Sequence, residues 1–264
     1  MTATEDTASV LANAAFGDDP GRWPLPGAVT PAQRWLRAVA AGGQGRYSCA
    51  LTELTELCRT QTGSLLSLAY STRASFLRQL GWHTRARDAD GTAWAHSGTD
   101  SEAAADALVG LAADALGVGR FGVSERLLHR ALTAGGGAHP RVAVRLAWVG
   151  AELAMARGDG VGAVDRAERG VVAAAGYGST RHTVKSDVVL AAALCSADRL
   201  DAARSVADAA LSATETSGMV PLRWALACLL ADIGSTAHTS AEVREIRDVS
   251  ADTVRRRGGT WARR

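Results

Sequence analysis

Gly45-Arg46-Tyr47-Ser48-Cys49-Ala50-Leu51 opens a pattern that returns along most of the chain. In this stretch a small residue is followed, five residues later, by Ala, and an equivalent step from a small or polar residue to Ala or Ser occurs five times. The pairs are Gly45 and Ala50, Gly81 and Ala86, Gly119 and Ser124, Gly158 and Ala163, and Asp198 and Ala203. Their leading positions are nearly evenly spaced along the chain, and Gly234 continues the series. A regular spacing of this size predicts a stack of helical hairpins.

Helix packing explains why each unit needs these residue types. An apolar helix ends at the small residue, the chain turns, and the Ala or Ser of the next helix must lie against the first helix. A larger side chain would force the two axes beyond the usual separation of roughly 8–10 Å. Gly at the turn accepts the positive φ that helix ends commonly adopt. Because one hairpin alone leaves an apolar face uncovered, several hairpins must stack.

The units resemble those of a divergent bacterial member of the tetratricopeptide-repeat family. The stretch from Gly45 to Leu51 matches the family's turn and second-helix opening, small-x-aromatic-x-x-Ala-aliphatic. Gly119-Arg120-Phe121 repeats the aromatic residue, and Asp198-Arg199-Leu200-Asp201-Ala202-Ala203 follows the pattern with Leu in its place. The resemblance covers residues 31 to 234. It implies an all-α fold, a right-handed superhelix of about six stacked helical hairpins.

Further small residues of that family pattern occur in both helices of the units. The first helices carry Ala seven residues before the turn, at Ala74, Ala112, Ala151, Ala191 and Ala227. The second helices carry a later small residue at Ala93, Ala131, Gly170 and Ala210.

The chain divides into three expected regions. Residues 1–30 form an N-terminal arm, with a short helix around Thr7 to Ala15 and turn-rich sequence after it. Residues 31–239 form the repeat domain, in which Thr30 caps the first helix and Pro31 begins it. Residues 240–264 supply a C-terminal capping helix and a basic tail. The hairpins are expected at 31–59, 64–97, 101–134, 140–175, 180–215 and 221–257.

Composition bounds the class of protein. Of the 264 residues 47% are hydrophobic but only 5% are aromatic, so that apolar content is mainly Ala, Val and Leu, which suits closely packed helices. The net charge of +2 gives no overall signal for a polyanion. The first ten residues lack the pattern of a signal peptide, and no apolar run is long enough to span a bilayer. We therefore expect a cytoplasmic protein with no membrane partner.

Catalytic and metal-binding motifs are missing from the sequence. The four cysteines have no Cys-x-x-Cys spacing and fall on expected helices, which favours buried thiols over disulfides or zinc. The six histidines are scattered, with no pair four residues apart, and no nucleophile motif such as Gly-x-Ser-x-Gly occurs. We expect no enzyme activity, no metal and no cofactor.

The resemblance places the first helix of each hairpin along a concave groove. It assigns eight residues to binding in that groove: Ser71, Ser75, Arg78, Gln79, Arg145, Trp148, Glu152 and Lys185. Arg145 and Lys185 occupy equivalent positions in adjacent hairpins, so they should form a row that could hold a carboxylate or phosphate. The alternative is an ordinary solvated helix face. The Lys and Asn pattern of the family's carboxylate clamp is absent.

Two other segments allow a functional and a structural interpretation. Gly176-Tyr177-Gly178-Ser179-Thr180-Arg181-His182 is Gly-rich before a helix, as in some phosphate sites. It lacks a Gly-Lys-Ser/Thr ending, and we favour a long loop capped by Ser179 or Thr180.

Residues 240–257 resemble a bacterial helix-turn-helix, in which Ser250 would cap the recognition helix. Thr253, Arg255, Arg256 and Arg257 would then contact DNA. The favoured alternative is one amphipathic helix that covers the last hairpin with an apolar side. That side comprises Val243, Ile246, Val249 and Val254.

These observations favour a non-catalytic scaffold that binds a protein or peptide, with acidic groups on the partner, in the groove of a tetratricopeptide-like array. The alternative function is a transcriptional regulator whose C-terminal segment binds nucleic acid, and it ranks second.

Overall fold

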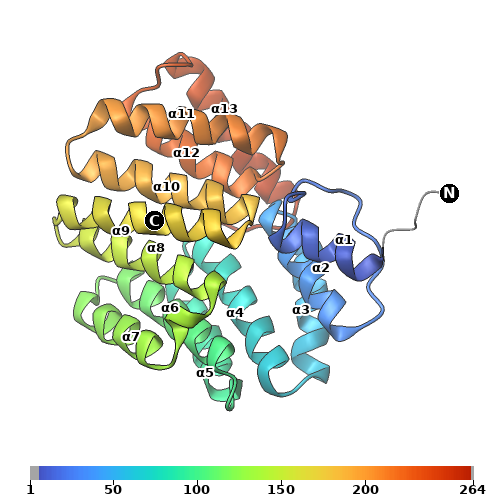
Figure 1. The fold of residues 1–264 in the computed structure, drawn as a ribbon. Coiled ribbons are helices and arrows are strands. Elements are labelled where there is room, and N and C mark those ends of the chain that lie inside the picture. Colours follow the sequence, from blue (N-terminus) through green and yellow to red (C-terminus); the bar gives the residue numbers. More distant parts are fainter. Residues whose placement is uncertain (1–5, 263–264) are drawn as a thin grey trace.

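A computed structural model describes residues 6–262. Within these residues all regular secondary structure is helical, and there is no strand (Figure 1). The expectation of an all-α fold is confirmed. The elements are α1 (Thr7–Phe16), α2 (Pro31–Gly43), α3 (Tyr47–Thr60), α4 (Gly63–Gln79), α5 (His83–His96), α6 (Ser101–Gly117), α7 (Phe121–Thr133), the 3-10 helix η1 (Gly136–Ala138), α8 (Pro140–Ala156), α9 (Gly160–Tyr177), α10 (Thr180–Ser196), α11 (Leu200–Thr216), α12 (Val220–Ile233) and α13 (Ser240–Arg256).

Helices that follow one another along the chain pack against one another, so α2 to α13 form six antiparallel hairpins in sequence order (Figure 1). Each hairpin begins and ends within two residues of its expected bounds. The first helix of a hairpin also packs on the first helix of the next, as α4 does on α6 and α8 does on α10. Among the described residues, no helix combines the length and the apolar character needed to cross a membrane.

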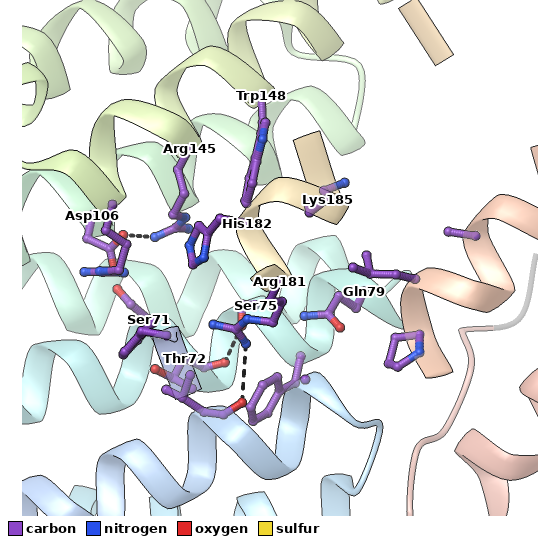
Figure 2. Close-up of a pocket in the computed structure, with 18 of the residues that line it drawn as sticks. Ser71, Thr72, Ser75, Gln79, Asp106, Arg145, Trp148, Arg181, His182 and Lys185 are labelled. Atoms are coloured by element: carbon purple, nitrogen blue, oxygen red, sulfur yellow. Dashed lines mark hydrogen bonds and ion pairs between the residues drawn. The ribbon is translucent and has the colours of Figure 1, made fainter. Parts of the chain in front are cut away.

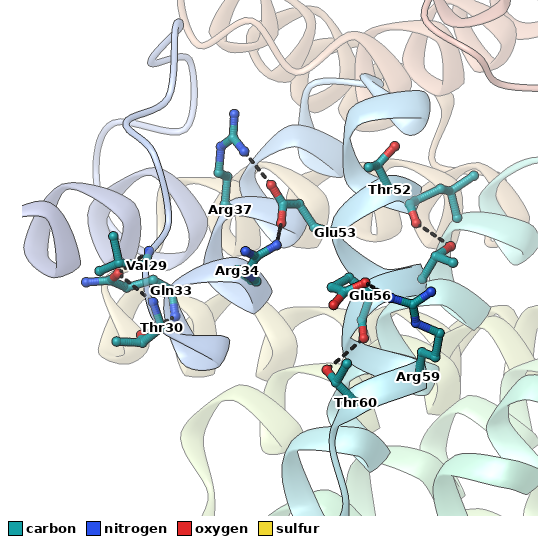
Figure 3. A network of polar contacts seen from close by, with 12 residues as sticks. Val29, Thr30, Gln33, Arg34, Arg37, Thr52, Glu53, Glu56, Arg59 and Thr60 are labelled. Atoms are coloured by element: carbon teal, nitrogen blue, oxygen red, sulfur yellow. Dashed lines mark hydrogen bonds and ion pairs between the residues drawn. The ribbon is translucent and has the colours of Figure 1, made fainter.

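Capping at the start of the first hairpin follows the sequence signal. The Thr30 hydroxyl accepts a hydrogen bond from the Gln33 N–H at 3.2 Å, and the Gln33 side chain accepts one from the Thr30 N–H (Figure 3). Pro31 is the first helical residue. This capping box satisfies backbone groups that a helix leaves without partners.

The turns inside the hairpins use the left-handed conformation that the repeated glycines predict. Gly45, Gly81, Gly119 and Gly158 have φ between +73° and +88°. Asp198 takes the same place in the fifth hairpin with φ +59°, and it is the one non-glycine residue with positive φ in the described part of the chain. The short polar side chain of Asp tolerates this conformation better than most.

The small residues lie where the two helices of a hairpin touch. Ala50, Ala86, Ser124, Ala163 and Ala203 are all fully buried. The five alanines that precede the turns are fully buried as well. Full burial of these small residues agrees with the packing reason given for the repeat, since small side chains let helices approach closely.

The N-terminal arm packs on both the first and the fifth hairpin. Helix α1 lies against α2 and touches α10. At its end the Gly17 carbonyl accepts a hydrogen bond from the Thr180 N–H at 3.1 Å. The buried Gln44 amide donates to the carbonyls of Pro20 and Arg22, both at 2.9 Å, and this fixes the turn-rich segment that follows. The arm thus bridges two hairpins that are far apart in sequence.

Residues 257–262, called here the C-terminal segment, return to the first two hairpins. The Arg257 carbonyl accepts from the Ser48 N–H at 3.0 Å, and the Ala262 N–H donates to the Leu80 carbonyl at 2.8 Å. The Thr260 carbonyl accepts from the Trp82 indole at 2.6 Å. In Figure 1 the red end of the chain accordingly lies beside the blue helices. The segment expected as a basic tail instead joins the last hairpin to the first.

Helix α13 runs without a break from Ser240 to Arg256, which makes the helix-turn-helix interpretation wrong in its structural part. That interpretation needs a turn before Ser250, but Ser250 is buried in the middle of the helix. Arg255 pairs with Asp252, and the Arg256 guanidinium donates to the Thr253 hydroxyl at 2.9 Å. DNA contact by Thr253, Arg255 and Arg256 remains an untested prediction.

The apolar side of α13 is narrower than expected. Val243 and Val254 are fully buried and Ile246 packs in the same cluster as Val243, but Val249 is 55% exposed. Arg257, assigned to DNA contact in the alternative, donates to the Gln44 carbonyl at 2.8 Å and helps to close the array.

Burial of the cysteine thiols was predicted, and this is wrong for Cys49, which is exposed on α3. The other three cysteines are partly buried, and all four are free thiols.

The turn conformations generate a paired prediction. Gly158→Ala should lower the free energy of unfolding by about 1 kcal/mol, because alanine is strained at φ +77°. No atom lies within 4 Å of the added Cβ, so a clash would not contribute. Asp198→Gly, at the equivalent turn, should raise stability by about 0.5 kcal/mol. Urea unfolding followed by circular dichroism measures both, and an unchanged Gly158→Ala midpoint would contradict the turn assignment.

The contacts of the C-terminal segment generate a second prediction. Deleting residues 258–264 should lower the melting temperature, because Trp261 and the hydrogen bonds to Leu80 and Trp82 are lost together. Gly259→Ala should act in the same direction, since its Cβ would lie 2.5 Å from Val254 and 2.8 Å from Tyr47. Differential scanning calorimetry gives the measurement, and equal melting temperatures would show that the segment does not hold the array closed.

Candidate functional site

The inner side of the array holds a partly open cavity of about 340 Å³ (Figure 2). The first helix of every hairpin contributes to its wall, together with Phe16 at the end of α1 and Trp261 of the C-terminal segment. Residues from the first and the last hairpin face the same space because the array is closed between them. The remaining wall residues are Trp35, Val39, Gly43, Ser71, Thr72, Ser75, Phe76, Gln79, Asp106, Arg141, Arg145, Trp148, Arg181, His182, Lys185, Pro221, Leu222, Trp224 and Ala225.

Most of the residues that the sequence assigned to a groove line this cavity. They are Ser71, Ser75 and Gln79 on α4, Arg145 and Trp148 on α8, and Lys185 on α10. Two assigned residues lie outside its wall. Arg78 is buried behind α4 in an ion pair with two aspartates. Glu152 pairs with Lys185 at 3.5 Å and so neutralises part of the expected cationic row.

Asp106 holds the two arginines of α8 in place. Its carboxylate is 3.1 Å from the Arg141 guanidinium and also forms an ion pair with Arg145. Arg141 makes a second ion pair, with Glu102 at 3.1 Å. Burial, with the charge of Arg78 nearby, lowers the pKa of Arg145 to about 10. Arg145 is therefore part of a neutralised, partly buried cluster and is not the exposed cation that the sequence suggested.

Arg181 is differently placed from the other cations. Its guanidinium donates to the Val39 carbonyl at 3.3 Å and lies 5.6 Å from the Phe16 ring. Within residues 6–262 it forms no ion pair with any carboxylate. Burial, together with the charge of Arg141, lowers the pKa of Arg181 to about 10. Gly43 leaves space for it, because a Cβ there would lie 3.2 Å from the arginine side chain.

Aromatic rings surround the neighbouring His182. Its ring stacks on Trp148 at 5.4 Å and meets Tyr177 edge-on at 5.0 Å, while Nδ1 lies 2.9 Å from the Ser179 hydroxyl. Burial, with Arg181 and other arginines nearby, lowers the pKa of His182 well below its usual range. The imidazole is therefore neutral at physiological pH, and it adds an aromatic surface without adding charge.

Tryptophans supply most of the apolar wall. Trp35 donates to the Thr72 hydroxyl at 2.9 Å, and Trp148 donates to the Ser186 hydroxyl at 2.8 Å, so both rings have fixed orientations. Trp224 and Trp261 contact each other with ring centroids 4.2 Å apart. The Trp261 indole N–H is buried without a hydrogen-bond partner, as is the Ser71 hydroxyl. Buried donors of this kind normally have a partner.

The charged side chains in and beside the cavity wall occupy equivalent positions in successive hairpins. Glu102, Arg141 and Arg181 stand at one such position in three consecutive hairpins, and Asp106, Arg145 and Lys185 stand at the position one helical turn later. Sequence reasoning noticed only Arg145 and Lys185. Extending the comparison by one helical turn and one hairpin would have found the other four residues, but not Phe16 or Trp261, which come from outside the repeats.

The comparisons with known proteins return no relative. No family model matches the chain, and neither a curated protein nor a solved structure matches it. In the described part of the chain no three His, Cys, Asp or Glu side chains gather as metal ligands would.

Behind the cavity wall, Arg78 forms ion pairs with two buried carboxylates. It lies 2.7 Å from Asp90 and 2.6 Å from Asp114, and it also donates to the Gly110 carbonyl at 3.1 Å. Burial raises the pKa of Asp90 to about 7 and raises that of Asp114. Gly110 is required here, because a Cβ would lie 2.2 Å from the Asp90 carboxylate. One cation cannot fully compensate two buried carboxylates, so one of them favours the protonated form.

This cluster predicts a pH-dependent stability. In the folded protein Asp90 keeps its proton up to about pH 7, whereas in the unfolded chain it loses it near pH 4. The stability that this group contributes is therefore lost as the pH rises from about 4 to 7. Asp90→Asn should reduce the difference in melting temperature between pH 5 and pH 8, since the amide does not titrate. The exposed Asp88, changed to Asn, is the control. A full pH dependence in Asp90→Asn would contradict this account.

Proposed function

We propose that this protein is a non-catalytic binding module that receives an acidic group of a protein or peptide partner in its central cavity. The repeat pattern and the hairpin order support a right-handed, tetratricopeptide-like superhelix as its scaffold. In such an array the first helices of the hairpins face inward, and here all six contribute to one cavity.

One observation carries the proposal. Four cationic side chains and four tryptophans, from segments far apart in sequence, line a single cavity. Figure 2 labels Arg145, Trp148, Arg181 and Lys185 among them. The cations are Arg141, Arg145, Arg181 and Lys185, and the tryptophans are Trp35, Trp148, Trp224 and Trp261. Arginine and tryptophan are the residue types that most often carry binding energy at interfaces. A simple gap between packed core side chains would be lined mainly by aliphatic residues.

The geometry also decides which substitution can test the proposal. Arg145→Glu would place a second carboxylate beside the buried Asp106 and would threaten the fold. Lys185 is a better choice. Its side chain is 31% exposed, its ion pair with Glu152 is long at 3.5 Å, and it lies 5.9 Å from the Trp148 ring.

We expect a library of random displayed peptides, selected on the wild-type protein, to become enriched in Asp and Glu. An enriched peptide, made synthetically, should lose about 10-fold or more of its affinity for Lys185→Glu, because a favourable charge contact becomes a repulsive one. Fluorescence anisotropy with a labelled peptide gives the dissociation constants.

Arg199→Glu is the matched control, since Arg199 is exposed and lies at the turn that follows α10. It should bind the peptide as the wild type does. Enrichment without acidic residues, or equal binding by Lys185→Glu, would sink the proposal.

A further inference from the structure

Arg181 and Lys185 continue two series of equivalent charged positions along the hairpins, and neither series has a charged residue in the next hairpin. Aligned on the turn of each hairpin, the positions of Arg181 and Lys185 correspond to Ser217 and Pro221 in the next hairpin, which carry no charge. On the other side, α6 supplies Glu102 and Asp106, which neutralise the arginines of α8. These carboxylates therefore balance the charges of the α8 arginines and leave the cations of α10 with fewer carboxylate partners.

Of the four cations that line the cavity, Arg181 is the one that this arrangement leaves without a carboxylate partner. Lys185 has Glu152, and both arginines of α8 have Asp106, but Arg181 has only the Val39 carbonyl. A partly buried guanidinium without a counter-ion is costly, and the cost is reduced when an anion binds beside it. Four cationic side chains thus face three carboxylates, an excess of one positive charge within the described residues.

Neutral donors and aromatic surfaces complete the surroundings. The buried Ser71 hydroxyl lines the cavity without a partner, and so does the Trp261 indole N–H. Figure 2 shows Arg181 and His182 directed toward the side chains of α4, among them Ser71 and Ser75. The rest of the wall is largely aromatic. The site therefore offers one surplus cation, donors without partners and flat apolar surfaces in one partly open cavity.

We propose that the cavity binds an amphipathic monocarboxylate, a single carboxylate on an aromatic or apolar body, with Arg181 as the partner of the carboxylate. This assignment rests on the proposed function for the location of the site and adds the chemistry of the ligand. A guanidinium pairs well with a carboxylate because two parallel hydrogen bonds form. The body packs against the tryptophans, where its apolar surface leaves water.

The charges favour a carboxylate over a phosphate. One surplus positive charge balances a monoanion, whereas a phosphate monoester carries about −1.5 to −2 at neutral pH. The Asp106 carboxylate in the wall would repel the additional charge. The volume of about 340 Å³ lies at the lower end of the range of ligand sites, which suits a small acid or a single residue of a chain end.

Isothermal titration calorimetry with 3-phenylpropionate tests the proposal on the full-length protein. We expect saturable binding of 3-phenylpropionate and at least about 10-fold weaker binding of 3-phenylpropionamide and of phenyl phosphate. Two peptides then distinguish the source of the carboxylate. If acetyl-Gly-Gly-Phe with a free carboxylate binds more tightly than 3-phenylpropionate, the ligand is a chain end. If it binds more weakly, the ligand is a free small acid. Its C-terminal amide should not bind in either case.

Arg181→Met separates recognition from folding. Methionine keeps an unbranched side chain and removes a charge that has no carboxylate partner, so the melting temperature should stay equal or rise. Binding of 3-phenylpropionate should fall by about 10-fold or more, while Arg181→Lys should retain part of it. Arg199→Met, at the exposed control position, should leave binding unchanged.

Three results would overturn the proposal: no binding of 3-phenylpropionate, equal binding of the amide or phenyl phosphate, or unchanged binding by a folded Arg181→Met. These results leave the proposed function open to its own test, because acidic peptides that depend on Lys185 could still be selected. Conversely, 3-phenylpropionate could bind through Arg181 while no peptide is selected. That result would contradict the proposal of a protein partner and would support the monocarboxylate site.

Discussion

Close contact between the two helices of a hairpin is the constraint from which the architecture follows. The contact needs a turn with positive φ and a small residue five positions later, and it repeats from Gly45 and Ala50 onward. Ala50, Ala86 and their equivalents are accordingly fully buried. The hairpins pack on one another in sequence order, and their first helices line one inner space.

Closure of the array turns that inner space into a cavity. Contacts of Arg257, Thr260 and Ala262 with the first two hairpins join the two ends of the array. Helix α1 adds a second bridge, from the first hairpin to the fifth. An open array would expose its concave side to water, where charges are screened and ion pairs contribute little. Here Arg141, Arg145 and Arg181 are partly buried, so their charges interact more strongly with the groups around them than charges on an open surface would.

Burial changes the roles of residues that look alike in sequence. Arg145 and Arg181 are both positively charged at neutral pH and both come from first helices that line the cavity. Arg145 is held by Asp106 and belongs to the structure of the wall, while Arg181 has a backbone carbonyl in place of a carboxylate. Arg78, also expected to face the groove, is occupied by Asp90 and Asp114 behind it. The counter-charges, which come from other hairpins, decide which cation remains for a ligand.

Local sequence determined the helices, their turns and the order of the hairpins, because these depend on contacts within one repeat or between adjacent repeats. The periodic Gly and Ala residues fixed the hairpin boundaries to within two residues, and the register of the repeats placed Arg145, Trp148 and Lys185 on an inward face. Tertiary structure alone decided the closure by the C-terminal segment, the entry of Phe16 into the cavity, and the state of each charge. These features arise between segments up to 213 residues apart, as between Arg257 and Gln44. They depend on how all six hairpins pack together, which no pattern within one repeat or between adjacent repeats records.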